Sequence, residues 1–146
     1  MSYSSQHQPF LQLHEPEAIY LSGESSISLI GQIRTGFSFK DMLAFSDTIE
    51  KGLSDFSTVL QVSLRTLQRY NEDKKLNQPQ SERLWELSKL YGHGYSVFDS
   101  RGAFNQWMDT PNPLLGGVTP FSLLDTHAGL EMVNNLIGRI EHGVYS

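Results

Sequence analysis

The sequence contains no cysteine in its 146 residues. Disulfide bonds and thiolate metal sites are therefore excluded, as expected for a protein of the reducing cytoplasm. No apolar run approaches the roughly 20 residues that a membrane-spanning helix requires. The polar segment 1–14 lacks the basic start and apolar stretch of a secretory signal. These absences predict a cytoplasmic protein that is neither exported nor anchored in a membrane.

Basic side chains are scarce. The chain has 11 Lys and Arg against 16 Asp and Glu, for a formal net charge of −5, which argues against a protein that coats nucleic acid over its whole surface. The distribution is uneven. Residues 55–96 hold six basic and five acidic side chains. Residues 1–54 hold three basic and six acidic side chains, and residues 97–146 hold two basic and five acidic side chains. A local DNA-binding face is therefore best sought in the middle of the chain.

Signatures of enzymes are also missing. None of the five histidines has a partner at a metal-binding spacing. The stretch Leu115-Gly116-Gly117 lacks the lysine and the preceding strand of a phosphate-binding loop, and no serine stands in a nucleophile motif. The sequence predicts a binding protein without catalytic residues, metal or cofactor.

Apolar residues recur mostly at helical spacing, which predicts an all-α protein. The predicted organisation is an N-terminal arm over 1–37 that could be partly ordered, a helix-turn-helix unit over 38–96 and a small helical domain over 97–146. Within the arm, the loose alternation from Ser25 to Ile33 fits either a strand or a short helix.

Small polar residues mark the predicted helix starts in the middle of the chain. The expected N-caps are Ser38, Ser54, Ser63 and Ser81. The helix from Ser63 is expected to run to about Glu72, and residues 77–79 to form a turn. Gly92 and Gly94 are expected to follow the end of the fourth helix.

The last fifty residues contain more turn signals. Ser100 is the expected N-cap of a short helix, and Thr119-Pro120 begins another that ends near Asp125. Thr126 begins the final helix, which Gly143 terminates in a left-handed conformation. The candidate core residues of this part are Trp107, Pro111, Leu115, Pro120, Leu123 and Leu124, together with the apolar stripe of the final helix, Leu130, Val133, Ile137 and Ile140.

Two short helices joined by a tight turn are typical of a helix-turn-helix motif. Here segment 54–60 is followed by Gln61-Val62 and by the helix from Ser63, whose Leu64 and Leu67 are expected to face inward. The candidate DNA-binding residues are Ser63, Arg65, Thr66, Gln68, Arg69, Lys74 and Lys75. Any amphipathic surface helix also presents arginine and glutamine to solvent, so the pattern alone leaves both interpretations open.

The C-terminal motifs resemble those of a known family. They are AFNQWM at 103–108, TPNPLLGG at 110–117, TPFSLL at 119–124 and RIEHGVY at 139–145. In this order and spacing they resemble the toxin-binding domain of Xre/MbcA/ParS antitoxins, whose toxins carry the RES fold. Segment 63–70 is similar to the Xre-type helix-turn-helix half of the same family. The resemblance covers roughly residues 38–146.

The resemblance implies a non-enzymatic antitoxin of a type II toxin–antitoxin pair. Its cognate RES-domain toxin would consume NAD, by degradation or by ADP-ribosylation, and the C-terminal domain would cover the toxin's active site. On this account Arg139 enters the nucleotide pocket, although an arginine at a helix end also suits the helix dipole. The expected toxin-binding residues are Asn135, Arg139, His142, Gly143, Val144, Tyr145 and Ser146.

The resemblance also implies operator DNA as a partner. The antitoxin would repress its own operon through the helix-turn-helix and form a homodimer or a toxin–antitoxin hetero-oligomer. One alternative is a stand-alone transcriptional regulator whose C-terminal domain mediates dimerisation. Another is a protease adaptor or scaffolding module.

Overall fold

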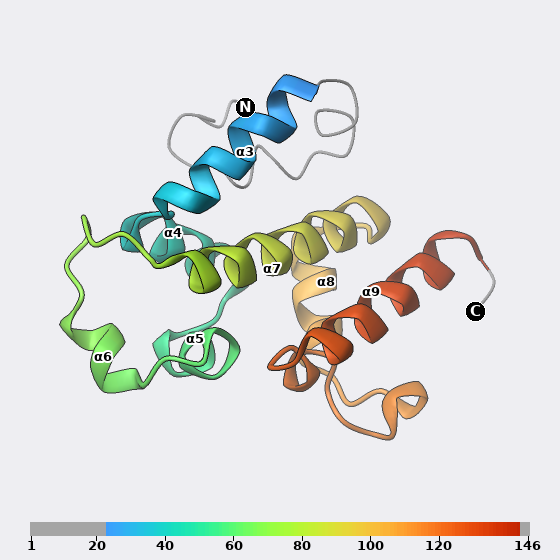
Figure 1. Ribbon diagram of the computed structural model, residues 1–146. Coiled ribbons are helices and arrows are strands. Elements are labelled where there is room, and N and C mark those ends of the chain that lie inside the picture. Colours follow the sequence, from blue (N-terminus) through green and yellow to red (C-terminus); the bar gives the residue numbers. More distant parts are fainter. Residues whose placement is uncertain (1–22, 144–146) are drawn as a thin grey trace. The chain divides into compact units, whose positions relative to one another are not determined.

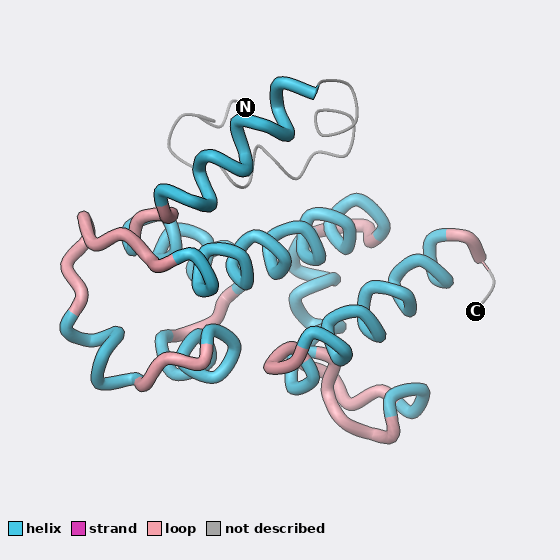
Figure 2. The backbone as a smooth tube through the Cα atoms, viewed as in Figure 1, coloured by secondary structure: helices cyan, strands magenta, loops and turns pink. Residues whose placement is uncertain are grey.

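The chain is helical in the residues that the computed structural model describes, 23–143 (Figure 1). Its α-helices are α3 (Gly23–Thr35), α4 (Phe39–Ile49), α5 (Leu53–Leu60), α6 (Leu64–Arg69), α7 (Gln78–Val97), α8 (Arg101–Met108) and α9 (His127–Glu141). Two short 3-10 helices, η2 (Pro113–Leu115) and η3 (Phe121–Leu123), lie between α8 and α9. Within 23–143 the extended pairing is limited to isolated bridges, and Figure 2 shows no strand. The prediction of an all-α protein is confirmed.

The chain divides into two compact units within α7. The first unit ends at Lys89 and the second begins at Leu90. The sequence favours a division after Ser96, since Gly92 and Gly94 suggest the end of a helix. That expected helix end is wrong, because α7 continues through both glycines to Val97.

The segment that the sequence leaves open between strand and helix is helical, in α3. Of the predicted arm, residues 1–22 lie outside the described part. After α3 the chain reverses tightly at Gly36, whose φ of +100° suits glycine and whose position leaves no room for a Cβ beside the Leu76 carbonyl. The next residue, Phe37, is buried and donates its N–H to Ser81 Oγ at 3.1 Å. This turn fixes α3 to the start of α7.

The core of the first unit is built from the apolar faces of α4 to α7. Ser38 caps α4 by accepting the Asp41 N–H at 3.1 Å, as predicted. The rings of Phe45 and Phe56 meet edge to face, with centroids 6.2 Å apart, and join α4 to α5. The other buried apolar side chains of this unit are Phe37, Phe39, Met42, Ile49, Val59, Leu60, Leu67, Leu76, Leu84, Trp85 and Leu87.

Several predicted helix starts in this unit are corrected. Helix α5 begins after Gly52 rather than Ser54, because the Gly52 N–H donates to the Asp55 carboxylate at 3.1 Å. Helix α7 begins at Gln78 rather than Ser81. Its first turn is closed reciprocally, since Asn77 Oδ1 accepts the Gln80 N–H and Gln80 Oε1 accepts the Asn77 N–H. Residues 77–79 therefore start the helix instead of forming a separate turn.

The third predicted helix is shorter than expected. Helix α6 ends at Arg69, not near Glu72, because the following chain pairs with the segment before α4. The Lys74 carbonyl accepts the Phe39 N–H at 2.8 Å, and the Leu76 N–H donates to the Phe37 carbonyl at 2.8 Å. These backbone bonds require an extended conformation that helix continuation would exclude.

The second unit packs α8 and α9 with the end of α7 around aromatic side chains. The Phe104 ring lies 5.2 Å from Tyr91 and 5.8 Å from Trp107, centroid to centroid. A Cβ at Gly94 would overlap the Phe104 ring, so this helical glycine admits the ring to the core. The buried apolar side chains are Leu90, Tyr91, Phe104, Met108, Leu124, Val133, Leu136 and Ile137.

Two of the three predicted N-caps of the second unit are confirmed. Ser100 Oγ accepts the Ala103 N–H at 3.0 Å, and Thr126 Oγ1 accepts the Gly129 N–H at 2.9 Å. Gly143 follows α9 with φ +68°, as predicted. The predicted cap at Thr119 is wrong, because the helix there is only the 3-10 helix η3, whose N-cap is Pro120.

The predicted core of the second unit is only partly correct. Pro120 and Leu124 are buried, whereas Trp107, Leu115 and Leu123 are half-buried. Pro111 is exposed, because it stands in the loop before η2 rather than on a packed face. On the last helix the predicted apolar stripe is confirmed at Val133 and Ile137, which are buried, whereas Leu130 and Ile140 are half-buried. The rest of the core comes from α7 and α8.

Candidate functional site

Helix α6 is held against the first unit by both of its ends and by one buried side chain. Before α6, Gln61 adopts a left-handed conformation with φ 58°, and the Val62 carbonyl accepts the Ser57 hydroxyl at 2.6 Å. Leu67 is fully buried, as predicted, but Leu64 is 37% exposed, so its predicted inward orientation is wrong. A helix anchored mainly through Leu67 presents most of its surface to solvent.

The outer face of α6 carries the predicted nucleic-acid contacts. Arg65, Gln68 and Arg69 are exposed, and Gln68 and Arg69 follow Arg65 by three and four residues, so both are its neighbours on the helix surface. Neither arginine has a carboxylate partner within 4.0 Å among residues 23–143. The two guanidinium groups are therefore available to an anionic partner.

The remaining predicted contacts differ in how they are engaged. Ser63 Oγ accepts the Thr66 N–H at 3.1 Å and donates to Thr66 Oγ1 at 2.8 Å, so its hydroxyl is used in capping α6. The ammonium group of Lys74 lies 5.4 Å from the centroid of the Tyr70 ring, a cation–π contact at the exit of the helix. Both lysines after α6 are exposed, but only Lys74 is held beside the motif by an aromatic ring.

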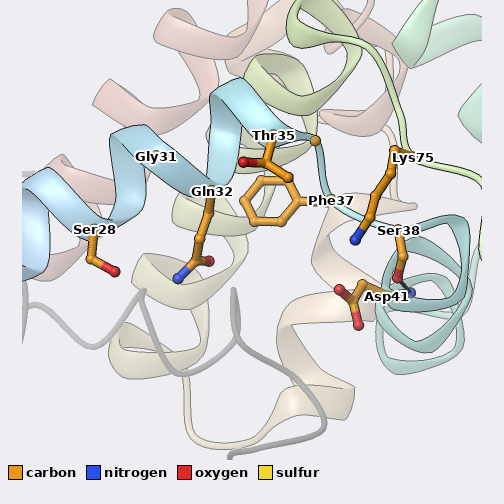
Figure 3. Close-up of a pocket in the computed structure, with 9 residues that line it drawn as sticks. Ser28, Gly31, Gln32, Thr35, Phe37, Ser38, Asp41 and Lys75 are labelled. Atoms are coloured by element: carbon orange, nitrogen blue, oxygen red, sulfur yellow. Dashed lines mark hydrogen bonds between the residues drawn. The ribbon is translucent and has the colours of Figure 1, made fainter.

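Lys75 faces a different surface. It lines a hollow of about 440 Å³ between α3 and the start of α4, together with Ser28, Gly31, Gln32, Thr35, Gly36, Phe37, Ser38 and Asp41 (Figure 3). In Figure 3 the Lys75 side chain points to the end of the hollow where Ser38 and Asp41 lie. The sequence does not predict this hollow, since its lining comes from segments about forty residues apart.

The loop before α9 is fixed by its backbone and by one buried amide. Asn112 is buried, and its side-chain oxygen accepts the Leu114 N–H at 2.9 Å. Its main chain is paired with the Val118 carbonyl at 3.0 Å and with the Gly117 N–H at 2.9 Å. Gly116 and Gly117 have φ of +77° and +85°, which glycine adopts without strain. The loop is therefore an ordered part of the second unit.

The exposed end of α9 carries the predicted toxin contacts that the structure describes. Asn135 and Arg139 are exposed and one turn apart, and they border a small hollow of about 130 Å³ with Leu114, Leu115, Met132 and Leu136. His142 and Gly143 are also exposed. The predicted contacts Val144, Tyr145 and Ser146 lie outside the described residues.

An apolar patch beside Arg139 is missing from the sequence prediction. Leu114 is 52% exposed and Met132 is 53% exposed, although both belong to large apolar types. Both border the same small hollow as Arg139. Exposed apolar side chains gathered at a hollow indicate an interaction surface more than scattered ones do, and only the fold brings this loop to this helix.

Membrane-spanning helices and metal-ligand clusters are both absent from the described residues. None of the helices in 23–143 is long and apolar enough to cross a membrane. In the same range, no group of three or more His, Asp or Glu side chains is arranged to hold a metal ion.

Comparisons with known proteins match both units. Residues 28–89 match the family model of the antitoxin Xre-like helix-turn-helix domain. Residues 93–143 match that of the antitoxin Xre/MbcA/ParS C-terminal toxin-binding domain. The exposed face of α6 thus lies in the part matched by the helix-turn-helix model, and the end of α9 lies in the part matched by the toxin-binding model.

Curated relatives match along most of the chain. An antitoxin Xre of Yersinia enterocolitica is 32% identical over 122 residues, which are 81% of each protein. An antitoxin Xre of Photorhabdus laumondii is 36% identical over 97 residues, 65% of this chain and 66% of the relative. A "Prs ADP-ribosylating antitoxin" of Sphingobium is 28% identical over 135 residues, 84% of this chain and 83% of the relative. The chain therefore belongs to the Xre/MbcA/ParS antitoxins, a non-enzymatic family, and combines an Xre-like helix-turn-helix domain with a C-terminal toxin-binding domain.

Proposed function

We propose that this antitoxin neutralises a RES-domain toxin that consumes NAD, by covering the toxin's active site with the end of α9. The observation that supports this most directly is Arg139, which stands exposed at the end of the toxin-binding domain beside the exposed side chains of Leu114 and Met132. Arginine and adjoining apolar contacts are typical of the residues that dominate interface affinity.

The charge of this domain suits such a target. Residues 97–146 hold two basic and five acidic side chains, so they carry a formal charge of −3. The net negative charge favours a partner with a positively charged surface, whereas Arg139 would need hydrogen-bond acceptors or an acidic group on that partner. The Sphingobium relative is named for ADP-ribosylation, a reaction that consumes NAD. These observations favour a nucleotide-binding toxin as the partner.

Coexpression tests this function. The toxin encoded beside this chain is expected to stop growth and deplete NAD when expressed alone, and to be harmless when the antitoxin is present. Deletion of residues 139–146 is expected to abolish rescue while leaving DNA binding, because the deletion removes the end of α9 but none of the first unit. Full rescue by the truncated protein would show that another surface neutralises the toxin.

We further propose that the first unit represses the operon by binding operator DNA as a homodimer or as part of a toxin–antitoxin hetero-oligomer. The exposed arginines of α6 support this proposal, because they lie on one face with Gln68 and have no described carboxylate partner. Arginine and glutamine read base edges or hold phosphates, and a dimer would present two such helices to two half-sites.

Replacement of Arg69 by alanine is expected to weaken operator binding by about 1–3 kcal/mol if the side chain reads a base. A matched control is Arg34→Ala, which removes the same charge from an exposed position on α3. Fluorescence anisotropy with the operator and with an unrelated duplex at one salt concentration separates base reading from phosphate contact. Equal losses of operator affinity in the two variants would mean that Arg69 contributes only nonspecific electrostatic attraction to DNA.

A further inference from the structure

A histidine of α7 bridges two turns of α9. His93 Nδ1 lies 3.1 Å from Asn134 Oδ1, and His93 Nε2 lies 2.8 Å from Glu141 Oε1. All three residues belong to the second unit. Asn134 and Glu141 are seven residues apart, so they lie on one face of α9, two turns from each other. One imidazole ring therefore spans the last two turns of the helix.

The His93 ring can hold both partners at once. Nε2 donates to the Glu141 carboxylate, and Nδ1 meets the side-chain amide of Asn134, which offers both an acceptor and a donor. The hydrogen bond from His93 lowers the pKa of Glu141 below its ordinary value of 4.5, and His142 acts in the same direction. The Glu141 carboxylate is therefore ionised at neutral pH.

Other charged groups around the bridge are few. The remaining charged or titratable side chains of α8 and of α9 with its C-cap are Arg101, His127, Glu131, Arg139 and His142. Arg101 is placed over the Tyr95 ring, at 5.4 Å from its centroid, and His127 lies at the opposite end of α9. The carboxylate that faces His93 is that of Glu141.

The bridged part of α9 has a weak point. Gly138 lies between Asn134 and Glu141 on the same face, and glycine costs a helix interior about 1 kcal/mol relative to alanine. A Cβ at Gly138 would meet nothing within 4 Å, so no close packing requires this glycine. The turn after Gly138 carries Arg139. A contact with another helix therefore stabilises α9 most effectively at this position.

We propose that His93 is a positioning residue that ties the turns on either side of Gly138 to α7 and so holds the toxin-binding end of α9 in one orientation. That this end binds the toxin rests on the proposed function. The side chains of His93 and Glu141 are 28% and 44% exposed, so solvent screens their contact. Its loss should change local stability only about two- to five-fold.

The lowered pKa of Glu141 sets the pH range of the contact. The carboxylate contribution is present above the ordinary carboxyl value of 4.5 and is lost as the pH falls through the lowered value. The bridge is therefore expected at neutral pH and is lost in strongly acid solution.

Amide hydrogen exchange of the full chain without toxin tests the bridge. In His93→Ala, protection factors at residues 139–143 are expected to fall about two- to five-fold at neutral pH. Glu141→Gln should give a similar loss, and the double variant should lose little more than either single one. Gly138→Ala should restore protection in the His93→Ala background, because it strengthens the same turn. His127→Gln, at the other end of α9, is the matched control and should change none of these amides.

The result that would overturn the bridge is unchanged protection in His93→Ala. A second arm measures affinity for the neighbouring toxin. His93→Ala is expected to weaken binding about two- to five-fold, with recovery on adding Gly138→Ala. A reduced protection with unchanged affinity would overturn the positioning role. If the wild-type chain binds no toxin, the proposed function fails, and the exchange experiment still decides whether the bridge exists.

Discussion

Replacing Gly129 by alanine is expected to destabilise the second unit by about 3 kcal/mol or more. Gly129 is buried in the first turn of α9, directly over η3. A Cβ there would overlap the carbonyl oxygen of Leu123 and lie 2.8 Å from its carbonyl carbon. Both atoms belong to the main chain, so no change of rotamer can relieve the overlap. The helix would have to move away from η3, which would open the core at Leu124 and Val133.

Thermal unfolding measures this effect, and the two tryptophans report on separate units. Trp85 lies in the first unit and Trp107 in the second, so a Trp85→Phe background isolates the second. The matched control is Gly138→Ala on the same helix, which meets nothing within 4 Å and should stabilise by about 0.5–1 kcal/mol. A Gly129→Ala protein with the wild-type transition would show that η3 and α9 are not packed this closely.

Replacing Arg139 by alanine is expected to weaken toxin binding by at least about 2 kcal/mol, roughly 30-fold. The guanidinium is exposed at the end of α9 and has no described carboxylate partner, so its loss should cost the free antitoxin little. In the proposed complex, the same group would be desolvated within the toxin and would form several hydrogen bonds. The effect should therefore appear in affinity and not in stability.

Calorimetric titration of a catalytically inactive toxin measures this loss. Arg139→Lys keeps the charge without the planar fork of donors, so an intermediate affinity is expected if the contact is bidentate. Glu131→Ala is the matched control, because it removes an exposed charge two turns earlier on the same helix. Wild-type affinity in Arg139→Ala would remove this side chain from the proposed interface and leave the apolar patch as the anchor.

Helix starts that depend on local chemistry are predictable from the sequence. Ser38, Ser63, Ser100 and Thr126 cap helices as expected, because each side chain accepts an N–H only three residues ahead. Gly52 shows the limit of this rule, since a downstream aspartate caps α5 while the glycine has no side chain to signal it. An acceptor on the cap residue is not sufficient either, since Asn77 caps α7 where the sequence favours Ser81.

Features that depend on distant contacts are not predictable in this way. Gly94 suggests a helix end, but its place inside α7 follows from the Phe104 ring, ten residues later in the chain. The early end of α6 follows from pairing with the segment before α4. In each case a contact that only the fold creates overrides a local preference.

The proposed toxin-binding surface shows the same division. The exposed positions of Asn135 and Arg139 follow from the spacing of apolar residues in α9. The apolar patch of Leu114 and Met132 does not, because large apolar residues are expected in a core. The contact of His93 with Glu141 joins residues 48 positions apart. The helical spacing of apolar residues cannot predict a contact between residues so distant in the chain.

In the loop over 112–118, the residues that fix the backbone conformation differ from those that expose their side chains to solvent. Its shape depends on a buried asparagine and on two glycines with positive φ, whereas Leu114 and Val118 project outward and are 52% and 42% exposed. Substitutions at these outward positions should barely alter folding. Evolution can therefore vary the displayed side chains freely while the scaffold stays fixed. Related antitoxins in one genome could diverge by this route until each recognises its own toxin and ignores the others.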